Sequence, residues 1–272
     1  MPELPEVETI CRGLKKTVCG RRIERVRVMD ARVIRNMPAA AFDRCLRGAE
    51  ISDVRRRGKA VIFVLAPAGQ FLVVQLMMTG QLIYDQGQGA FPATKVIFHL
   101  SNSGRVLYND HRLFGRLQVV QELDEIPYFR ILGPEPLART FDRAAFVQGL
   151  ADRRLPVKSL LMDHRFVAGI GNIYASEILA ACGIRPQRPA GSLSRSEQDA
   201  VYDAMVSVLR DAVRARGTSI NTYRDGDGMR GRYQHALRVY GRDGQACRVC
   251  GQTIERVVLS GRSTFFCPGC QH

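Results

Sequence analysis

The stretch Leu132-Gly-Pro-Glu-Pro-Leu137 divides the chain into two parts with different hydrophobic periods. Two prolines and a glycine in so short a run interrupt helices and β-ladders alike. Before it, residues 22–132 contain short runs rich in β-branched residues, which Gly, Asn or Pro turns separate. After it, apolar residues recur at helical spacing. We therefore predict a linker between a β-domain and a helical domain.

The two parts consist of short, recognisable elements. Many short strands at close spacing are typical of a sandwich or barrel. In the helical part, Ser194 and Glu197 have the spacing of a capping box. Residues 217–236 are polar and glycine-rich, and we expect them to form a mobile loop. The predicted strands are 23–28, 61–65, 71–74, 95–100, 106–108 and 117–120, and the predicted helices are 142–151, 155–162, 172–182 and 194–216.

Composition limits the class of protein. A chain of 272 residues is long enough for two domains with a sizeable core. Apolar runs stay below membrane-spanning length and the N-terminus is acidic, so we expect a soluble intracellular protein. The formal net charge of +14 favours a polyanionic partner, most simply nucleic acid. A merely basic soluble protein is the alternative that charge alone leaves open.

Four of the eight cysteines form two CxxC pairs near the end of the chain, Cys247/Cys250 and Cys267/Cys270. Sixteen residues separate the pairs, and four thiolates so arranged are typical ligands of a tetrahedral zinc ion. Redox pairs are the alternative. The other cysteines are scattered among apolar residues, and we expect buried, unpaired thiols there. The pattern does not indicate a secreted disulfide framework.

Between the cysteine pairs, the sequence predicts a β-hairpin. Residues 253–259 and 263–266 have strand character, and Ser260-Gly261 suits the turn. Arg262 is then expected at the tip, where an exposed Arg on a zinc-stapled ribbon suits a DNA groove. A solvated loop charge is the alternative reading of this Arg.

The first six residues, Met1-Pro-Glu-Leu-Pro-Glu6, combine a helix start with a reactive end. Pro5 suits the first turn of a helix whose apolar residues follow at helical spacing. If Met1 is removed, Pro2 presents a secondary amine next to the carboxylate of Glu3. This places a nucleophile beside an acid, and the two interpretations are compatible.

Three further motifs have both a structural and a functional interpretation. The turn 167–172 precedes a helix whose N-terminus, with Asn172 as a cap, could hold a phosphate; an ordinary helix connection is the alternative. Lys59 ends a basic run and could reach a phosphate or sugar, unless the run is only a solvated face. Met78 and Phe114 lie in predicted β-domain loops and suit wedges that fill the gap left by an extruded base, or simply core packing.

Together these residues resemble the formamidopyrimidine-DNA glycosylase family, whose members excise oxidised bases. The resemblance covers essentially the whole chain, and Leu4 matches the purine-lesion branch, since the endonuclease VIII-type branch usually has Gly there. The motifs are the opening nine residues, 57–59, 78–80, 110–115, 161–163, 169–177, 239–241 and the cysteine module.

The resemblance implies an α+β multidomain fold and a set of site residues. The first expected domain is a catalytic β-sandwich with an N-terminal helix (1–131), which a linker (132–140) follows. We then expect a helical domain with a helix–two-turn–helix and a lesion-capping loop (141–236), and a zinc hairpin (237–272). Pro2 attacks the C1′ carbon of the damaged nucleotide, Glu3 protonates the opening sugar and Lys59 assists proton transfer. The remaining implied contacts to DNA are made by Arg262, Met78, Lys95, Arg112, Phe114, Arg154, Lys158 and Asn172.

The chain departs from the family pattern at a few positions. It has Gln75-Leu-Met77 before Met78, His111 where a Pro is common, and Lys95 where a His contributes to DNA binding. These departures spare the chemistry and concern the opposite-base preference. The expected protein is a cytoplasmic bacterial monomer, associated with the nucleoid, that binds one structural zinc ion and damaged double-stranded DNA without contacting a membrane.

Overall fold

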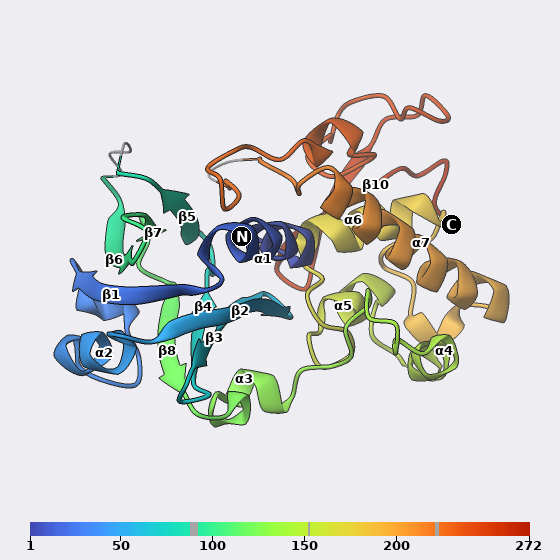
Figure 1. Cartoon of the computed structure of the whole chain (residues 1–272). Helices are drawn as coiled ribbons and strands as arrows, with labels where there is room; N and C mark the ends of the chain where they lie inside the picture. Colours follow the sequence, from blue (N-terminus) through green and yellow to red (C-terminus); the bar gives the residue numbers. More distant parts are fainter. Residues whose placement is uncertain (88–91, 152, 221–222) are drawn as a thin grey trace. The chain divides into compact units, whose positions relative to one another are not determined.

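The computed structural model describes residues 1–87, 92–151, 153–220 and 223–272. The chain forms two compact units, Met1–Arg130 with Ala215–Gln234 and Ile131–Arg214 with His235–His272 (Figure 1). This division differs from the expected one because the segment 215–234 belongs to the first unit. The second unit begins at Ile131, one residue before the Pro-rich stretch that was expected to form a linker.

The first unit contains an antiparallel sheet of eight strands in the order β5-β7-β6-β1-β2-β3-β4-β8 (Figure 1). Strand β1 joins two halves, because Arg21 and Arg22 pair with β2 whereas Ile23–Val28 pairs with β6. Side chains from both halves meet in one buried core, so the predicted β-sandwich is confirmed. The strands are β1 Arg21–Val28, β2 Glu50–Arg57, β3 Ala60–Ala66, β4 Phe71–Gln75, β5 Gln81–Asp85, β6 Thr94–Leu100, β7 Arg105–Asn109 and β8 Arg116–Val120.

Helix α1 (Leu4–Val18) packs on this core with its predicted apolar face. Val7, Ile10 and Leu14 are fully buried. The unit also contains α2 (Ala39–Leu46) and α3 (Pro127–Arg130). The sequence did not predict β2, because only Ile51 and Val54 of that strand point fully inward and an irregularity between Ile51 and Asp53 breaks the alternation.

The second unit is mainly helical, as predicted. It contains α4 (Arg143–Leu150), α5 (Val157–Met162), α6 (Asn172–Ala181) and α7 (Arg195–Arg214). The predicted capping box begins α7: the Glu197 carboxylate accepts the Ser194 N–H at 2.7 Å, and the Ser194 hydroxyl accepts the Glu197 N–H at 3.3 Å.

A hairpin of β9 (Glu255–Leu259) and β10 (Arg262–Phe266) closes the second unit and contacts α6. Ser260 and Gly261 form the predicted turn, with φ angles of 49° and 72° that suit a tight hairpin. Within the described ranges, no helix is long and apolar enough to cross a membrane.

Candidate functional site

The chain is buried in the first unit from its second residue on, whereas Met1 is exposed. Pro2 is buried, and Glu3 is only 3% exposed. The carboxylate of Glu6 accepts the N–H of Glu3 at 2.8 Å and the N–H of Thr218 at 2.7 Å. Gly217 is required at this contact, because it has φ +81° and a Cβ there would lie 2.7 Å from the Glu6 carboxylate. Glu6, to which the sequence assigned no role beyond the helix start, therefore ties the terminus to the segment 215–234.

The terminal amine of Met1 lies among charged groups of both signs. Burial lowers the pKa of the Met1 amine, the charges of Glu3 and Glu6 oppose this shift, and the charge of Lys59 adds to it. The terminus, Glu3 and Lys59 are therefore within electrostatic reach of one another. A carboxylate and an ammonium beside the same amine provide groups that can donate and accept protons there.

Lys59 lies in a tight turn between β2 and β3 that several groups hold. Its N–H donates to the Tyr128 hydroxyl at 3.3 Å. Arg56 donates from Nη1 to the carbonyl of Gly58 at 3.1 Å and from Nε to the Glu8 carboxylate at 2.9 Å. Burial acts to raise the pKa of Glu8, but the charges and hydrogen bonds of Arg56 and Arg12 outweigh it and lower this pKa. The side chain of Arg56, just before the turn, thus fixes the backbone that carries Lys59.

The side chains expected as wedges are exposed on two loops of the first unit. Met78 is 42% and Phe114 is 47% exposed. The guanidinium of Arg112 lies 4.6 Å from the centroid of the Phe114 ring. Asp110 is fully buried beneath these loops, although the sequence motif gave it no role of its own. Its position before Arg112 and Gly115 is the pattern of an Asx turn, which could have identified it.

Lys95, the other expected DNA contact of the first unit, is half-buried on β6. It lies where the register between β6 and β7 shifts, between Thr94 and Val96. Its carbonyl accepts the N–H of Met29 at 2.7 Å. Residues 221 and 222 of the expected lesion-capping loop lie outside the described residues.

In the second unit, Lys158 and Asn172 meet the zinc hairpin. Lys158 is 1% exposed and donates from Nζ to the Asn172 side-chain oxygen at 2.6 Å, to Thr264 Oγ1 at 2.7 Å and to the Ser263 carbonyl at 3.2 Å. The Asn172 amide donates to the same carbonyl at 2.9 Å. The prediction that Asn172 caps α6 was wrong. Gly171 is the cap, and Asn172 is the first helical residue, whose side chain turns to the hairpin instead.

Arg262 is exposed at the start of β10 and lines a hollow of about 190 Å³ with Lys158 and Ser159. A hollow with two cations on its walls suits an anion such as a phosphate. Arg154 is exposed between α4 and α5 and is not among the residues that line this hollow. The structure therefore brings together three of the four expected DNA contacts of this unit.

The four predicted zinc ligands form one cluster. The sulfurs of Cys250 and Cys267 lie 3.3 Å apart and those of Cys247 and Cys270 lie 3.9 Å apart, and all ligand atoms are within 4.8 Å of one another. Tetrahedral zinc with Zn–S bonds of about 2.3 Å requires sulfurs about 3.8 Å apart. Burial opposes the shift, but backbone N–H groups lower the pKa of the Cys247 thiol to about 6. The residues therefore fit a structural zinc ion.

Glu177 of α6 is a second residue to which the sequence assigned no role. Its carboxylate is 1% exposed and accepts three backbone N–H groups, from Arg238 at 2.7 Å, Val239 at 3.0 Å and Tyr240 at 2.9 Å. The Tyr240 ring packs edge-on against Phe265 of the hairpin, with centroids 5.0 Å apart. Burial raises the pKa of Glu177, and the three N–H groups oppose this shift. Glu177 thus attaches α6 to the segment that leads into the zinc module.

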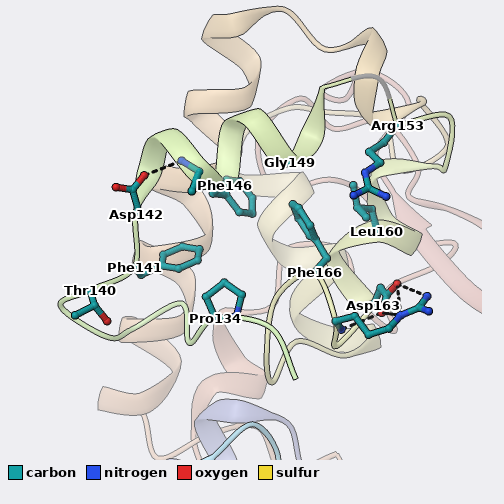
Figure 2. Close-up of a pocket in the computed structure, with 12 residues that line it drawn as sticks. Pro134, Thr140, Phe141, Asp142, Phe146, Gly149, Arg153, Leu160, Asp163 and Phe166 are labelled. Atoms are coloured by element: carbon teal, nitrogen blue, oxygen red, sulfur yellow. Dashed lines mark hydrogen bonds and ion pairs between the residues drawn. The ribbon is translucent and has the colours of Figure 1, made fainter. Parts of the chain in front are cut away.

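A larger cavity of about 540 Å³ lies elsewhere in the second unit, between α4 and the turn that follows α5 (Figure 2). Figure 2 shows Phe146 and Phe166 on its walls and Asp142 capping α4 through the N–H of Ala145 at 2.7 Å. The residues expected to bind DNA do not line this cavity.

Comparison with known proteins identifies the family. The chain matches the formamidopyrimidine-DNA glycosylase N-terminal domain over residues 1–117, its H2TH domain over 132–224, and a zinc finger found in FPG and IleRS over 244–272. It is 42% identical over 274 residues to the formamidopyrimidine-DNA glycosylase of Desulfitobacterium hafniense, with all of both chains covered.

Solved structures agree with this match. The MutM (FPG) protein of Thermus thermophilus is 40% identical with a TM-score of 0.89, and the match covers 99% of this chain and 98% of that protein. A Lactococcus lactis FPG mutant, G226P, in complex with Fapy-dG containing DNA, is 32% identical with a TM-score of 0.91 and full coverage of both chains. The four cysteines therefore hold one structural zinc ion. The chain belongs to the formamidopyrimidine-DNA glycosylase family and is a zinc-finger DNA glycosylase.

Proposed function

We propose that the chain is a bifunctional DNA glycosylase and abasic-site lyase that removes oxidised purines, such as 8-oxoguanine and formamidopyrimidines, from double-stranded DNA. The Lactococcus lactis relative solved with Fapy-dG containing DNA supports this substrate class. Leu4 supports the purine-lesion branch. The observation that carries the proposal is that Pro2 and Glu3 are buried together at the start of the chain, with the charge of Lys59 within reach of its amine.

The proposed nucleophile is the secondary amine that Pro2 presents once Met1 has been removed. An α-amine has a reference pKa of about 7.7–8.0, so a useful fraction is neutral near pH 7. Burial lowers the pKa of the Met1 amine at this end of the chain, and Pro2 itself is buried. The neutral nitrogen attacks C1′ and the glycosidic bond to the base breaks. Glu3 protonates the ring oxygen as the sugar opens, and an iminium forms between Pro2 and C1′.

The iminium explains why one site performs two reactions. It carries a positive charge without further protonation, because the nitrogen of proline is secondary. The charge makes the C2′ proton acidic, and its loss expels the 3′-phosphate. A second elimination expels the 5′-phosphate and leaves a gap with phosphate on both ends. Lys59, which the turn between β2 and β3 holds, assists these proton transfers.

The remaining residues are proposed to position the nucleotide. Lys158 and Arg262 hold a phosphate at the hollow beside the hairpin, and Asn172, which accepts a hydrogen bond from Lys158, adds a further phosphate contact. Met78, Arg112 and Phe114 fill the space that the extruded base leaves, which offsets an unstacking cost of a few kcal/mol. Lys95 and Arg154 add backbone contacts. We infer that the enzyme acts as a monomer, because a single chain supplies every group of this chemistry.

Borohydride trapping tests the proposal directly. Wild-type protein is mixed with a duplex that holds one 8-oxoguanine, and borohydride reduces the iminium to a stable protein–DNA adduct. Pro2→Gly should lower turnover strongly and leave DNA affinity largely intact. The fraction of chains that retain Met1, measured by N-terminal mass, is an internal control, since adduct yield should follow only the fraction without it.

Two outcomes would redirect the proposal. A DNA-binding protein without catalysis would bind the duplex and give no adduct even after Met1 removal. An enzyme of the pyrimidine-lesion branch would excise thymine glycol in preference to 8-oxoguanine from otherwise identical duplexes.

A further inference from the structure

Asp110 lies just beyond the end of β7 and has no exposed surface. Its Oδ1 accepts hydrogen bonds from the Thr79 hydroxyl at 2.5 Å and from the Arg112 N–H at 3.1 Å. Its Oδ2 accepts from the Gly115 N–H at 2.8 Å and from the Tyr108 hydroxyl at 3.2 Å. We call these five residues the Asp110 cluster. A buried carboxylate with four donors is fully satisfied and therefore rigid.

The donors of the Asp110 cluster come from two separate loops. Thr79 lies between β4 and β5, next to Met78, whereas Arg112 and Gly115 lie between β7 and β8, on either side of Phe114. The Thr79 hydroxyl also accepts the Arg112 N–H at 3.1 Å. The cluster therefore links the loop that carries Met78 to the loop that carries Arg112 and Phe114.

Both loops contain backbone strain that the cluster can hold. Met77 has φ 51° and Leu113 has φ 58°, a left-handed conformation that non-glycine residues seldom adopt. Each lies next to a side chain expected to enter DNA, Met78 or Phe114. Such conformations persist only where the surroundings fix them. The hydrogen bonds from Arg112 and Gly115 to Asp110 hold the second loop on either side of Leu113, and Thr79 extends this network to the first loop.

We propose that Asp110 is a positioning residue that locks both loops into one rigid wedge before DNA binds. The inference rests on the proposed function, in which Met78, Arg112 and Phe114 fill the gap left by the damaged base. Within the second loop, the guanidinium of Arg112 lies over the Phe114 ring, so these two side chains already support each other. When the wedge is ordered before binding, the entropic cost of fixing its side chains no longer reduces the binding free energy. Loss of the lock therefore slows base extrusion and spares the chemistry at Pro2.

Asp110→Asn tests the lock with little change in shape. In either orientation of the amide, its NH₂ group faces the N–H of Arg112 or that of Gly115. With the NH₂ group toward Gly115, the buried N–H of Gly115 loses its acceptor. With the NH₂ group toward Arg112, the N–H of Arg112 keeps only the Thr79 hydroxyl, and that hydroxyl loses the acceptor that links the two loops. Thr79→Val removes only the link between the loops, and Thr79→Ser restores the hydroxyl. Asp124→Asn, at an exposed aspartate, is the matched control.

The experiment compares two duplexes of one sequence under single-turnover conditions. One holds 8-oxoguanine opposite cytosine, and the other holds an abasic site, which has no base to extrude. Asp110→Asn should slow excision of 8-oxoguanine about tenfold and change borohydride trapping at the abasic site less than about twofold, because the loss of one buried hydrogen bond acts only on extrusion. Thr79→Val should also slow excision of 8-oxoguanine, but less than Asp110→Asn does. Thr79→Ser and Asp124→Asn should excise it at the wild-type rate.

Each alternative result is informative. Equal losses on the two duplexes would show general damage to the fold, and unchanged excision by both Asp110→Asn and Thr79→Val would show that the loops need no lock; either result overturns the inference. If Asp110→Asn does not fold, Thr79→Val alone decides between these outcomes. Wild-type protein that forms no adduct with either duplex would instead refute the proposed function, which separates the two failures.

Discussion

Replacing Glu177 by Gln should loosen the attachment of the zinc module to α6. The carboxylate accepts three backbone N–H groups, two on Oε1 and one on Oε2. The amide oxygen of Gln can keep the pair from Val239 and Tyr240. Its NH₂ group must then face the N–H of Arg238, which loses its acceptor inside the protein.

The size of the effect follows from these contacts. A hydrogen bond to a charged group contributes about 1.5–3 kcal/mol, and the two that remain become neutral and roughly half as strong. The variant no longer buries a charge, which offsets part of this loss, since burial raises the pKa of Glu177. We expect a net loss of about 3 kcal/mol, which for a unit of roughly 120 residues lowers Tm by on the order of 10 °C.

Thermal melting and hydrogen exchange measure this loss. The amides of Arg238, Val239 and Tyr240 should exchange about a hundredfold faster in Glu177→Gln, because local opening costs less free energy. Glu255→Gln changes an exposed carboxylate on the same module and should stay within about 0.5 kcal/mol of wild type. A Tm of Glu177→Gln within about 2 °C of wild type, with unchanged exchange at the three amides, would refute the reasoning.

Three further predictions concern the metal, pH and packing. Removal of zinc by a chelator should unfold the hairpin that carries Arg262 and lower duplex affinity more than about tenfold in fluorescence anisotropy; unchanged affinity after verified metal loss would contradict the structural role of zinc. The hydrogen bond from Arg188 lowers the pKa of Glu197 from 4.5 to about 2, so the pair stabilises the fold above pH 4.5 and this contribution disappears as pH falls toward 2. After solvent screening, the contribution of this pair to stability amounts to about 1 kcal/mol. Denaturant melts at pH 6 and pH 3 should show that the free energy of unfolding depends less on pH in Glu197→Gln than in wild type. The same pH dependence in both proteins would show that the pair does not contribute. Finally, Gly115→Ala would place a Cβ 1.6 Å from the Tyr108 hydroxyl oxygen. It should cost about 1–3 kcal/mol in urea unfolding, part of which the double variant with Tyr108→Phe recovers; an additive double variant would show that the clash is not the cause.

The sequence by itself determined most of the elements and the metal ligands, because these depend on local order. The period of apolar residues predicted α1 and the helices of the second unit, and the spacing of two CxxC pairs predicted the cluster of Cys247, Cys250, Cys267 and Cys270. The turn at Ser260-Gly261 follows from Gly261, which tolerates a positive φ. In each case the physical cause lies within a few residues of its effect.

Only the tertiary structure decided which groups share an environment. Glu6 binds Thr218, Lys158 binds Thr264, and the carboxylate of Glu177 binds backbone beyond residue 237; these pairs are far apart in the chain. For the same reason the segment 215–234 belongs to the first unit, although it follows the helices of the second in sequence. A buried carboxylate must find donors wherever the fold supplies them, and no local pattern encodes that partner. The starting residues illustrate both limits, because sequence alone shows a Pro-Glu end. The fold sets its surroundings: burial lowers the pKa of the Met1 amine, the charges of Glu3 and Glu6 oppose this shift, and the charge of Lys59 adds to it.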